Sequence, residues 1–262
     1  METIRIDGAA LEFQRLSGSA GHSSAAGRLA PVVFLHEGLG SVAMWRDWPA
    51  QVCAATGRDG IVYSRRGYGH SDRVADLRGA GRLAPDYMHR EALEVLPGLL
   101  SALGIVRPVL LGHSDGASIA LLHASRHQVS ACIVMAPHVI VEDMSIASIT
   151  QARQAYEAGN LRERLQRYHA DVDGAFWQWN EIWLSPAFRA FDIRPDCRRI
   201  AAPVLAIQGL DDPYGSARQV DEIAPTQGPF ETDMLPTCGH SPHRDQPQAT
   251  TSRVVRFLAG KS

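Results

Sequence analysis

Residues 108–122 read PVLLGHSDGASIALL and combine a buried-strand pattern, a glycine-flanked serine and a helical pattern. The central five residues fit Gly-x-Ser-x-Gly, in which a strand turns directly into a helix. Such a turn strains its middle residue, and the flanking Gly112 and Gly116 remove side chains that would collide there. A short turn with glycine and serine also recurs by chance, but the flanking strand and helix patterns favour catalysis. We therefore expect Ser114 to project from a sheet edge, at a helix N-terminus, as a nucleophile.

Short apolar runs alternate with longer amphipathic runs along the rest of the chain. The clearest helix covers residues 87–103, where apolar side chains recur at helical spacing before Gly104. Shorter helical patterns cover residues 117–127, 217–223 and 250–258. The expected strands are residues 4–6, 11–16, 32–36, 61–64, 108–112, 132–136, 204–208 and 231–235. This alternation predicts the α/β class, with a mostly parallel eight-stranded sheet flanked by helices in one domain, residues 1–262.

A segment at about residues 138–197 interrupts the alternation and is rich in charge and in aromatic side chains. Because it follows one core strand and precedes another, we expect a mainly helical cap over one end of the sheet. Its aromatic residues serve either a small core of the cap itself or a substrate pocket. We name Trp177 and Trp183 as candidate substrate-binding residues. The aromatic residues are Phe176, Trp177, Trp179, Trp183 and Phe188.

Composition restricts the partners of the protein. The 262 residues include 26 basic and 28 acidic side chains spread along the chain, a formal net charge of −2, so no basic field favours nucleic acid or an anionic membrane. The start lacks the pattern of a secretory signal, and no run approaches the roughly 18 apolar residues of a membrane span. Four widely separated cysteines read as free thiols. We predict a cytoplasmic protein that acts on a small molecule, and the oligomeric state stays open.

A catalytic serine needs a histidine to accept its proton and a carboxylate to orient that histidine. Asp211 and Asp212 follow the strand pattern at 204–208, and either is a candidate acid. His240 follows a glycine just after the last strand pattern, where the general base belongs, whereas His243 is a candidate pocket-lining or loop residue. The remaining histidines show no His-Glu-x-x-His or paired cysteine pattern, so we predict neither a metal nor another cofactor.

An oxyanion hole needs two backbone donors. One is the N–H of Asp115, the residue after the candidate nucleophile. The strand pattern at 32–36 leads into a glycine-rich turn, so we assign the second donor to Gly38, with Leu39 as the alternative. The Asp115 side chain either attracts a substrate ammonium or stabilises its helix N-terminus, and we favour the second interpretation.

These motifs, together with residues 36–41 (HEGLGS) and 64–71 (SRRGYGHS), resemble the α/β-hydrolase superfamily over nearly the whole chain. The resemblance implies a triad of Ser114, Asp212 and His240. It favours Asp212 over Asp211 because similar hydrolases carry the acid three residues after the glycine that ends the strand. A serine nucleophile argues against haloalkane dehalogenase and epoxide hydrolase chemistry, for which similar enzymes use aspartate.

Glu37 departs from the family pattern, because many members have glycine at this position. A carboxylate aimed at an oxyanion hole would oppose the developing negative charge, so we expect Glu37 to point away or to pair with Arg65 or Arg66. We also keep Glu37 among the candidate substrate-binding residues.

The predicted function is hydrolysis of a small or medium carboxylic ester, thioester or lactone through an acyl-enzyme. Three alternatives stay open: a carbon–carbon-bond hydrolase of a ketonic acid, a cofactor-free lyase or oxygenase, and a noncatalytic ligand receptor. Fold alone does not choose among these chemistries.

Overall fold

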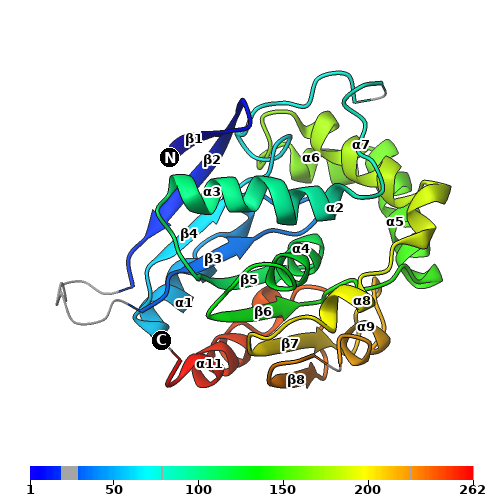
Figure 1. The fold of residues 1–262 in the computed structure, drawn as a ribbon. Helices are drawn as coiled ribbons and strands as arrows, with labels where there is room; N and C mark the ends of the chain where they lie inside the picture. The colour runs from blue at the N-terminus through cyan, green and yellow to red at the C-terminus, as the bar shows by residue number, and fades with distance from the viewer. Residues whose placement is uncertain (19–28, 78, 225, 262) are drawn as a thin grey trace.

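The computed structural model describes residues 1–18, 29–77, 79–224 and 226–261, which form an eight-stranded sheet (Figure 1). The strand order is β1-β2-β4-β3-β5-β6-β7-β8. β2 pairs antiparallel with β1 and β4, and the other pairs are parallel. The strands are β1 (Glu2–Ile6), β2 (Ala9–Leu16), β3 (Val32–Leu35), β4 (Gly60–Tyr63), β5 (Val109–His113), β6 (Ala131–Met135), β7 (Val204–Gly209) and β8 (Phe230–Leu235). The predicted mostly parallel, eight-stranded α/β fold is confirmed.

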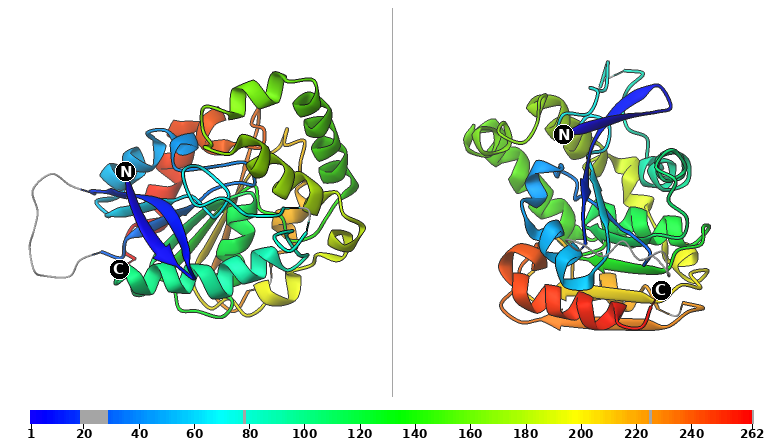
Figure 2. Two further views of the ribbon diagram at one scale, coloured as in Figure 1. Left: turned by 90° about the horizontal axis from the view of Figure 1, so that it is seen from above. Right: turned by 90° about the vertical axis from the view of Figure 1, so that its left-hand side faces the viewer.

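Both faces of the sheet are covered (Figure 2). Val32 and Phe34 of β3 face a core shared with α1 (Trp48–Thr56) and α11 (Pro247–Leu258), whereas Val33 and Leu35 face the opposite core, shared with α4 (Asp115–Ala124). Successive strand side chains point to opposite faces, so strands covered on both sides read as continuous apolar runs. Three short helices lie in the connections after β3, β7 and β8, namely η1 (Ala43–Trp45), α9 (Arg218–Asp221) and α10 (Pro242–Asp245).

The helix predicted over residues 87–103 contains a wide turn that the apolar spacing did not reveal. It consists of α2 (Tyr87–Arg90), a π-helical turn η2 (Glu91–Val95) and α3 (Leu96–Ala102). The Leu96 N–H donates to the Glu91 carbonyl, five residues back. Pro97 follows Leu96 and has no N–H, so it cannot donate the next hydrogen bond of an α-helix. The wide turn therefore lies where the α-helical pattern would lose a hydrogen bond in any case.

The segment between β6 and β7 is helical, as the sequence predicted for residues 138–197. Figure 1 shows α5, α6 and α7 grouped at one end of the molecule. The Trp179 indole of α7 lies against the backbone of Gly38, which follows β3, so this segment reaches the carboxyl ends of the central strands. Its helices are α5 (Asp143–Glu157), α6 (Asn160–Leu165), α7 (Val172–Trp183), η3 (Pro186–Ala190) and α8 (Arg194–Cys197).

All four cysteines are buried and none forms a disulfide. No helix within the described ranges combines the length and the apolar character that a bilayer crossing requires.

The first turn of α4 packs directly on the end of β3. A Cβ atom added at Gly116 would lie 2.1 Å from the carbonyl oxygen of Leu35, which is a backbone atom that cannot swing aside. The strand-to-helix turn at Ser114 therefore needs glycine at position 116 for steric reasons.

We expect Gly116→Ala to lower the free energy of unfolding by about 3 kcal/mol, since the added methyl forces a backbone shift in a packed core. Gly104→Ala is the matched control, because Gly104 has a φ of 67° but nothing within 4 Å of an added Cβ. Gly104→Ala should lower the free energy of unfolding by about 1 kcal/mol, because it introduces only the strain of a left-handed backbone. Urea unfolding of both variants measures the difference, and equal losses would contradict the steric account.

Candidate active site

Ser114 occupies a strained turn between β5 and α4. Its backbone has φ 53° and ψ −119°, a conformation that costs a non-glycine residue on the order of 1–3 kcal/mol. The Ser114 carbonyl accepts hydrogen bonds from the N–H groups of Ala117 and Ser118, at 2.9 Å and 3.1 Å, which tie the turn to the helix. The hydroxyl thus lies at the positive end of a ten-residue helix, as the sequence predicted.

The three residues of the predicted triad meet in hydrogen-bonding order. His240 Nε2 lies 2.9 Å from Ser114 Oγ, and His240 Nδ1 lies 2.8 Å from Asp212 Oδ2 and 3.0 Å from Oδ1. Asp212 is buried, whereas its alternative Asp211 is exposed. The structure therefore brings Asp212, and not Asp211, to the histidine.

Two further groups hold Asp212 in place. Gln208 Nε2 donates to Oδ2 at 2.8 Å, and the Tyr214 N–H donates to Oδ1 at 2.8 Å. Burial would raise the pKa of Asp212, but the hydrogen bond and charge of His240 and the Tyr214 N–H lower it, and the net pKa lies below its usual value. An ionised Asp212 keeps the proton on His240 Nδ1, which leaves Nε2 free to accept one from serine. Gln208 was missed by the sequence analysis, although it is a polar residue at the end of a buried apolar strand.

Arg65 orients the turn that carries Gly38. Its guanidinium donates to the carbonyls of His36 and Glu37, at 2.5 Å and 3.0 Å. The Glu37 carbonyl also accepts the Gly40 N–H at 3.0 Å. In a trans peptide the carbonyl and the following N–H point in opposite directions, so the Gly38 N–H points away from Arg65. The N–H of Asp115 belongs to the first residue of α4 and has no acceptor within that helix.

A small cavity of about 200 Å³ adjoins Ser114 and His240. Gly38 lines it, and a Cβ added at Gly38 would lie 2.1 Å from Trp179 Nε1, so glycine lets this indole pack on the turn. The other lining residues are Glu37, Leu39, His113, Ser114, Asp115, His138, Ile149, Trp179, Trp183, Tyr214, His240 and Ser241.

Trp177 does not belong to this lining, contrary to the sequence prediction. Its ring contacts Tyr156 and Phe176, with centroids 5.7 Å and 5.1 Å away, and Arg153 lies over it. Trp179 and Trp183 are four residues apart on α7 and share the face toward the cavity, whereas Trp177 lies two residues off that phase. Trp183 lines the cavity, as does Trp179, which the sequence analysis did not name. That Trp183 binds substrate stays a prediction.

Comparison with known proteins supports the same family as the motifs. The model of the alpha/beta hydrolase family matches residues 32–253. The chain belongs to the α/β-hydrolase family. It is 27% identical to the sn-1-specific diacylglycerol lipase ABHD11 of Mus musculus, over 88% of this chain and 81% of that protein.

Solved structures with 18–20% sequence identity share the fold. One is the enol-lactonase from Burkholderia xenovorans LB400, with a TM-score of 0.72 at 20% identity over 98% of this chain and 100% of that chain. Another is a carboxylesterase structure from Nitrososphaera gargenis, with a TM-score of 0.75 at 18% identity over 98% of each chain. The related proteins are hydrolases, and the family assignment rests on the family match.

Glu37 of this α/β-hydrolase has other partners than we expected. Arg244 Nη2 lies 3.3 Å from its Oε1, and His113 Nδ1 lies 3.4 Å from its Oε2. Burial would raise the pKa of Glu37, but His113 and Arg244 hold it well below its usual value. Pairing with Arg65 or Arg66 was a wrong expectation, because the Arg65 guanidinium is bound to backbone carbonyls.

His113 links this carboxylate to the loop of the candidate base. Its Nε2 lies 2.7 Å from the carbonyl oxygen of His240. His113, which precedes the candidate nucleophile Ser114, therefore holds the backbone of His240, the candidate base.

His243 is not part of the cavity lining, which corrects its prediction as a substrate-binding residue. The short helix α10 places its ring beside the stacked indoles of Trp45 and Trp48, with centroids 4.8 Å and 5.3 Å away. The side chain is buried, and neither ring nitrogen has a hydrogen-bond partner within the part of the chain that the structure describes. Its surroundings are those of an aromatic core residue.

The Asp115 carboxylate connects three helices. The Tyr87 hydroxyl at the start of α2 donates to Oδ2 at 2.7 Å, and Trp183 Nε1 at the end of α7 donates to Oδ1 at 3.2 Å. Burial raises the pKa of Asp115, although Arg65 and these two donors act in the opposite direction. Both carboxylate oxygens are therefore engaged by neighbouring side chains, an arrangement that neither sequence interpretation of Asp115 included.

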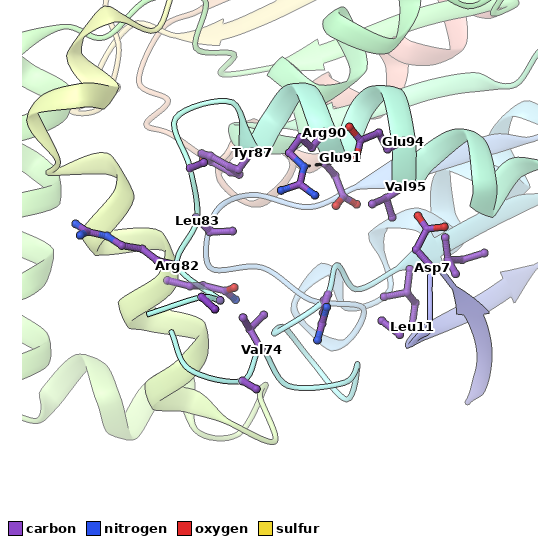
Figure 3. A pocket seen from close by; sticks show the side chains of 18 residues that line it. Asp7, Leu11, Val74, Arg82, Leu83, Tyr87, Arg90, Glu91, Glu94 and Val95 are labelled. Atoms are coloured by element: carbon purple, nitrogen blue, oxygen red, sulfur yellow. Dashed lines mark hydrogen bonds and ion pairs between the residues drawn. The ribbon is translucent and has the colours of Figure 1, made fainter. Parts of the chain in front are cut away.

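Figure 3 shows the side chains that line a second cavity. Its volume is about 650 Å³, larger than that of the cavity beside Ser114. Tyr87, Glu91 and Val95 line it from the helix of α2, η2 and α3, and Leu11 lines it from β2. Tyr87 thus contributes its ring to this cavity and its hydroxyl to Asp115.

Within the described ranges, no group of three or more His, Cys, Asp or Glu side chains is arranged to hold a metal ion. Independence from a metal stays a prediction.

We expect Tyr87→Phe to lower the free energy of unfolding by about 1–3 kcal/mol, because a buried carboxylate loses a charge-assisted hydrogen bond. Tyr168→Phe is the control, since no hydrogen bond joins the Tyr168 hydroxyl to a described residue. Urea unfolding at pH 7 measures both. A loss in Tyr87→Phe no larger than in the control would contradict the role of this hydroxyl.

His138 also lines the cavity, and burial together with the charge of His240 lowers its pKa to about 3. Between pH 6.5 and 3 the unfolded chain therefore binds a proton here that the folded protein does not, so this residue reduces stability as the pH falls through 6.5. We expect the free energy of unfolding of His138→Phe, relative to that of wild type, to rise by about 2 kcal/mol when the pH is lowered from 7 to 5. Urea unfolding at both pH values tests this, and a difference that does not depend on pH would refute it.

Proposed function

We propose that this protein is a serine hydrolase that cleaves a small or medium carboxylic ester, thioester or lactone through an acyl-enzyme. The observation that carries the proposal is the connected series of hydrogen bonds from Ser114 Oγ to His240 Nε2, at 2.9 Å, and from His240 Nδ1 to Asp212, at 2.8 Å. A nucleophile, a general base and an orienting carboxylate at hydrogen-bond distance are the components of acyl transfer.

In the acylation step, His240 Nε2 removes the proton of Ser114 Oγ while Oγ attacks the carbonyl carbon. The carbonyl oxygen becomes an oxyanion, for which the N–H groups of Gly38 and Asp115 are the donors. His240 then gives its proton to the leaving oxygen or sulfur, and the bond to the carbonyl carbon breaks. An alcohol or thiol leaves, and the acyl group stays on Ser114; a lactone opens and keeps its alcohol on the acyl group.

In the deacylation step, a water molecule takes the place of the leaving group. His240 removes one of its protons, and the hydroxide oxygen attacks the acyl carbon against the same two N–H groups. The Ser114 oxygen leaves with the proton from His240, which restores the enzyme and releases the acid. No cofactor takes part.

The cavity supports a small substrate. Its volume of about 200 Å³ is below the roughly 300–1,000 Å³ of typical ligand pockets. Trp179 and Trp183 of α7 supply an aromatic wall, and we propose that the helices between β6 and β7 act as a cap over bound substrate. The lipase and carboxylesterase named among the similar proteins favour an ester over a carbon–carbon bond.

We expect Ser114→Ala, His240→Gln and Asp212→Asn each to lower kcat for p-nitrophenyl acetate and butyrate by at least about a thousandfold. Asp211→Asn and His70→Gln, two changes at exposed side chains, are matched controls that should retain turnover. Wild type should also release a burst of p-nitrophenol equal to the enzyme concentration if deacylation is the slower step.

Unchanged turnover in Ser114→Ala would overturn the proposal. A protein that leaves esters intact but cleaves a vinylogous diketo acid would instead be a carbon–carbon-bond hydrolase.

A further inference from the structure

His138 is a buried polar side chain in the wall of the candidate active site. It follows β6, is 2% exposed and lines the cavity beside Ser114. Its ring centroid lies 4.9 Å from that of Trp183 and 5.7 Å from that of His240. The residue therefore lies next to the position that a bound substrate would take.

The backbone of His138 is firmly held, but its imidazole is not hydrogen-bonded. Its N–H donates to Ser118 Oγ at 3.1 Å, and Ser118 Oγ donates to its carbonyl at 2.6 Å. Nδ1 is buried without a partner, and no hydrogen bond joins either ring nitrogen to the part of the chain that the structure describes. Burying a polar group without a partner is unfavourable. The unpaired imidazole of His243 packs beside Trp45 and Trp48, whereas that of His138 borders the cavity, where a substrate atom can be its partner.

The state of the ring defines what it can bind. Burial keeps the imidazole neutral at physiological pH, so one nitrogen carries a hydrogen and the other accepts. Protein atoms enclose Nδ1 without offering an acceptor, which favours the tautomer with the hydrogen on Nε2. A neutral N–H donor in a cavity wall recognises an oxygen acceptor.

We infer that His138 donates a hydrogen bond to a second, uncharged oxygen of the substrate, so that the preferred substrates are esters that also carry an ether, ketone or further ester oxygen. This inference rests on the proposed function. The scissile carbonyl oxygen is a different atom, because the Gly38 and Asp115 amides are its donors. A carboxylate is excluded as the preferred group, since the carboxylates of Glu37 and Asp115 border the same cavity and the neutral ring supplies no compensating charge.

The test compares esters in isosteric or near-isosteric pairs, with and without the second oxygen. On the acyl side, p-nitrophenyl methoxyacetate is compared with butyrate, and 4-oxopentanoate with pentanoate. On the alcohol side, 2-methoxyethyl acetate is compared with butyl acetate by titration of the released acid. For each pair, the ratio of kcat/KM values in wild type is divided by the ratio in His138→Phe, which cancels differences in intrinsic reactivity.

We expect this double ratio to be about ten in at least one pair, the value of one hydrogen bond to substrate. His138→Gln, which keeps an N–H donor, should retain part of the preference. Ile149→Val is the matched control: it trims another buried lining residue without removing a polar group, and its double ratio should stay near one.

The possible failures are distinguishable. Ester turnover that depends on Ser114, with double ratios within twofold of one in every pair, would overturn the inference and leave the proposed function intact. A wild-type protein that hydrolyses none of the esters would overturn both. His138→Phe should unfold at a temperature no lower than wild type at pH 7, so a marked loss of stability would assign the residue a structural role instead.

Discussion

The backbone of Ser114, with φ 53° and ψ −119°, is the constraint on which the arrangement of the site depends. It exists because β5 turns into α4 without an intervening loop, and because Gly116 lets the helix touch the end of β3. The same turn places the Ser114 hydroxyl, the Asp115 N–H and the positive helix end on one side of the sheet edge. The proposed nucleophile and the proposed oxyanion donor are therefore positioned by one structural feature, and the core around this turn balances its strain.

Two buried carboxylates, Asp212 and Asp115, and the half-buried carboxylate of Glu37 surround this turn, and each has its own partners. Asp212 binds His240, Asp115 accepts from Tyr87 and Trp183, and Glu37 lies beside Arg244 and His113. An unpaired carboxylate here would oppose the negative charge that forms in the transition state. These partners reduce the conflict and also join elements that are distant in sequence, and Glu37, which departs from the family pattern, is among the carboxylates held in this way.

Much of the fold was predictable because its determinants are local. The strands β3 to β7 are buried along their whole length and are almost continuously apolar. All eight observed strands lie within two residues of their predicted ends. The strand, glycine and helix signals around Ser114 lie within fifteen residues. The positions of the two candidate acids, Asp211 and Asp212, and of His240 were predictable because they follow strands of recognisable pattern, and parallel strands bring their carboxyl ends to one edge. The choice of Asp212 came from the family resemblance.

The rest depended on geometry that local spacing does not encode. Glu37 and Arg244 are 207 residues apart, and the Tyr87–Asp115 bond joins residues 28 apart through packing of two helices. The sequence analysis named Trp177 and not Trp179. Tertiary packing determines which face of α7 meets the cavity, and the spacing of the aromatic residues does not reveal that face. His243 lies in an aromatic core because α10 turns it there, although its sequence resembles that of a pocket loop.

Labelling by a fluorophosphonate tests most directly whether the turn activates Ser114. The purified protein and its Ser114→Ala variant are incubated with the probe, and intact mass followed by peptide mapping locates the adduct. The account predicts one adduct per chain on Ser114 and none in the variant. A folded wild-type protein that stays unlabelled, or an adduct that persists in the variant, would contradict it.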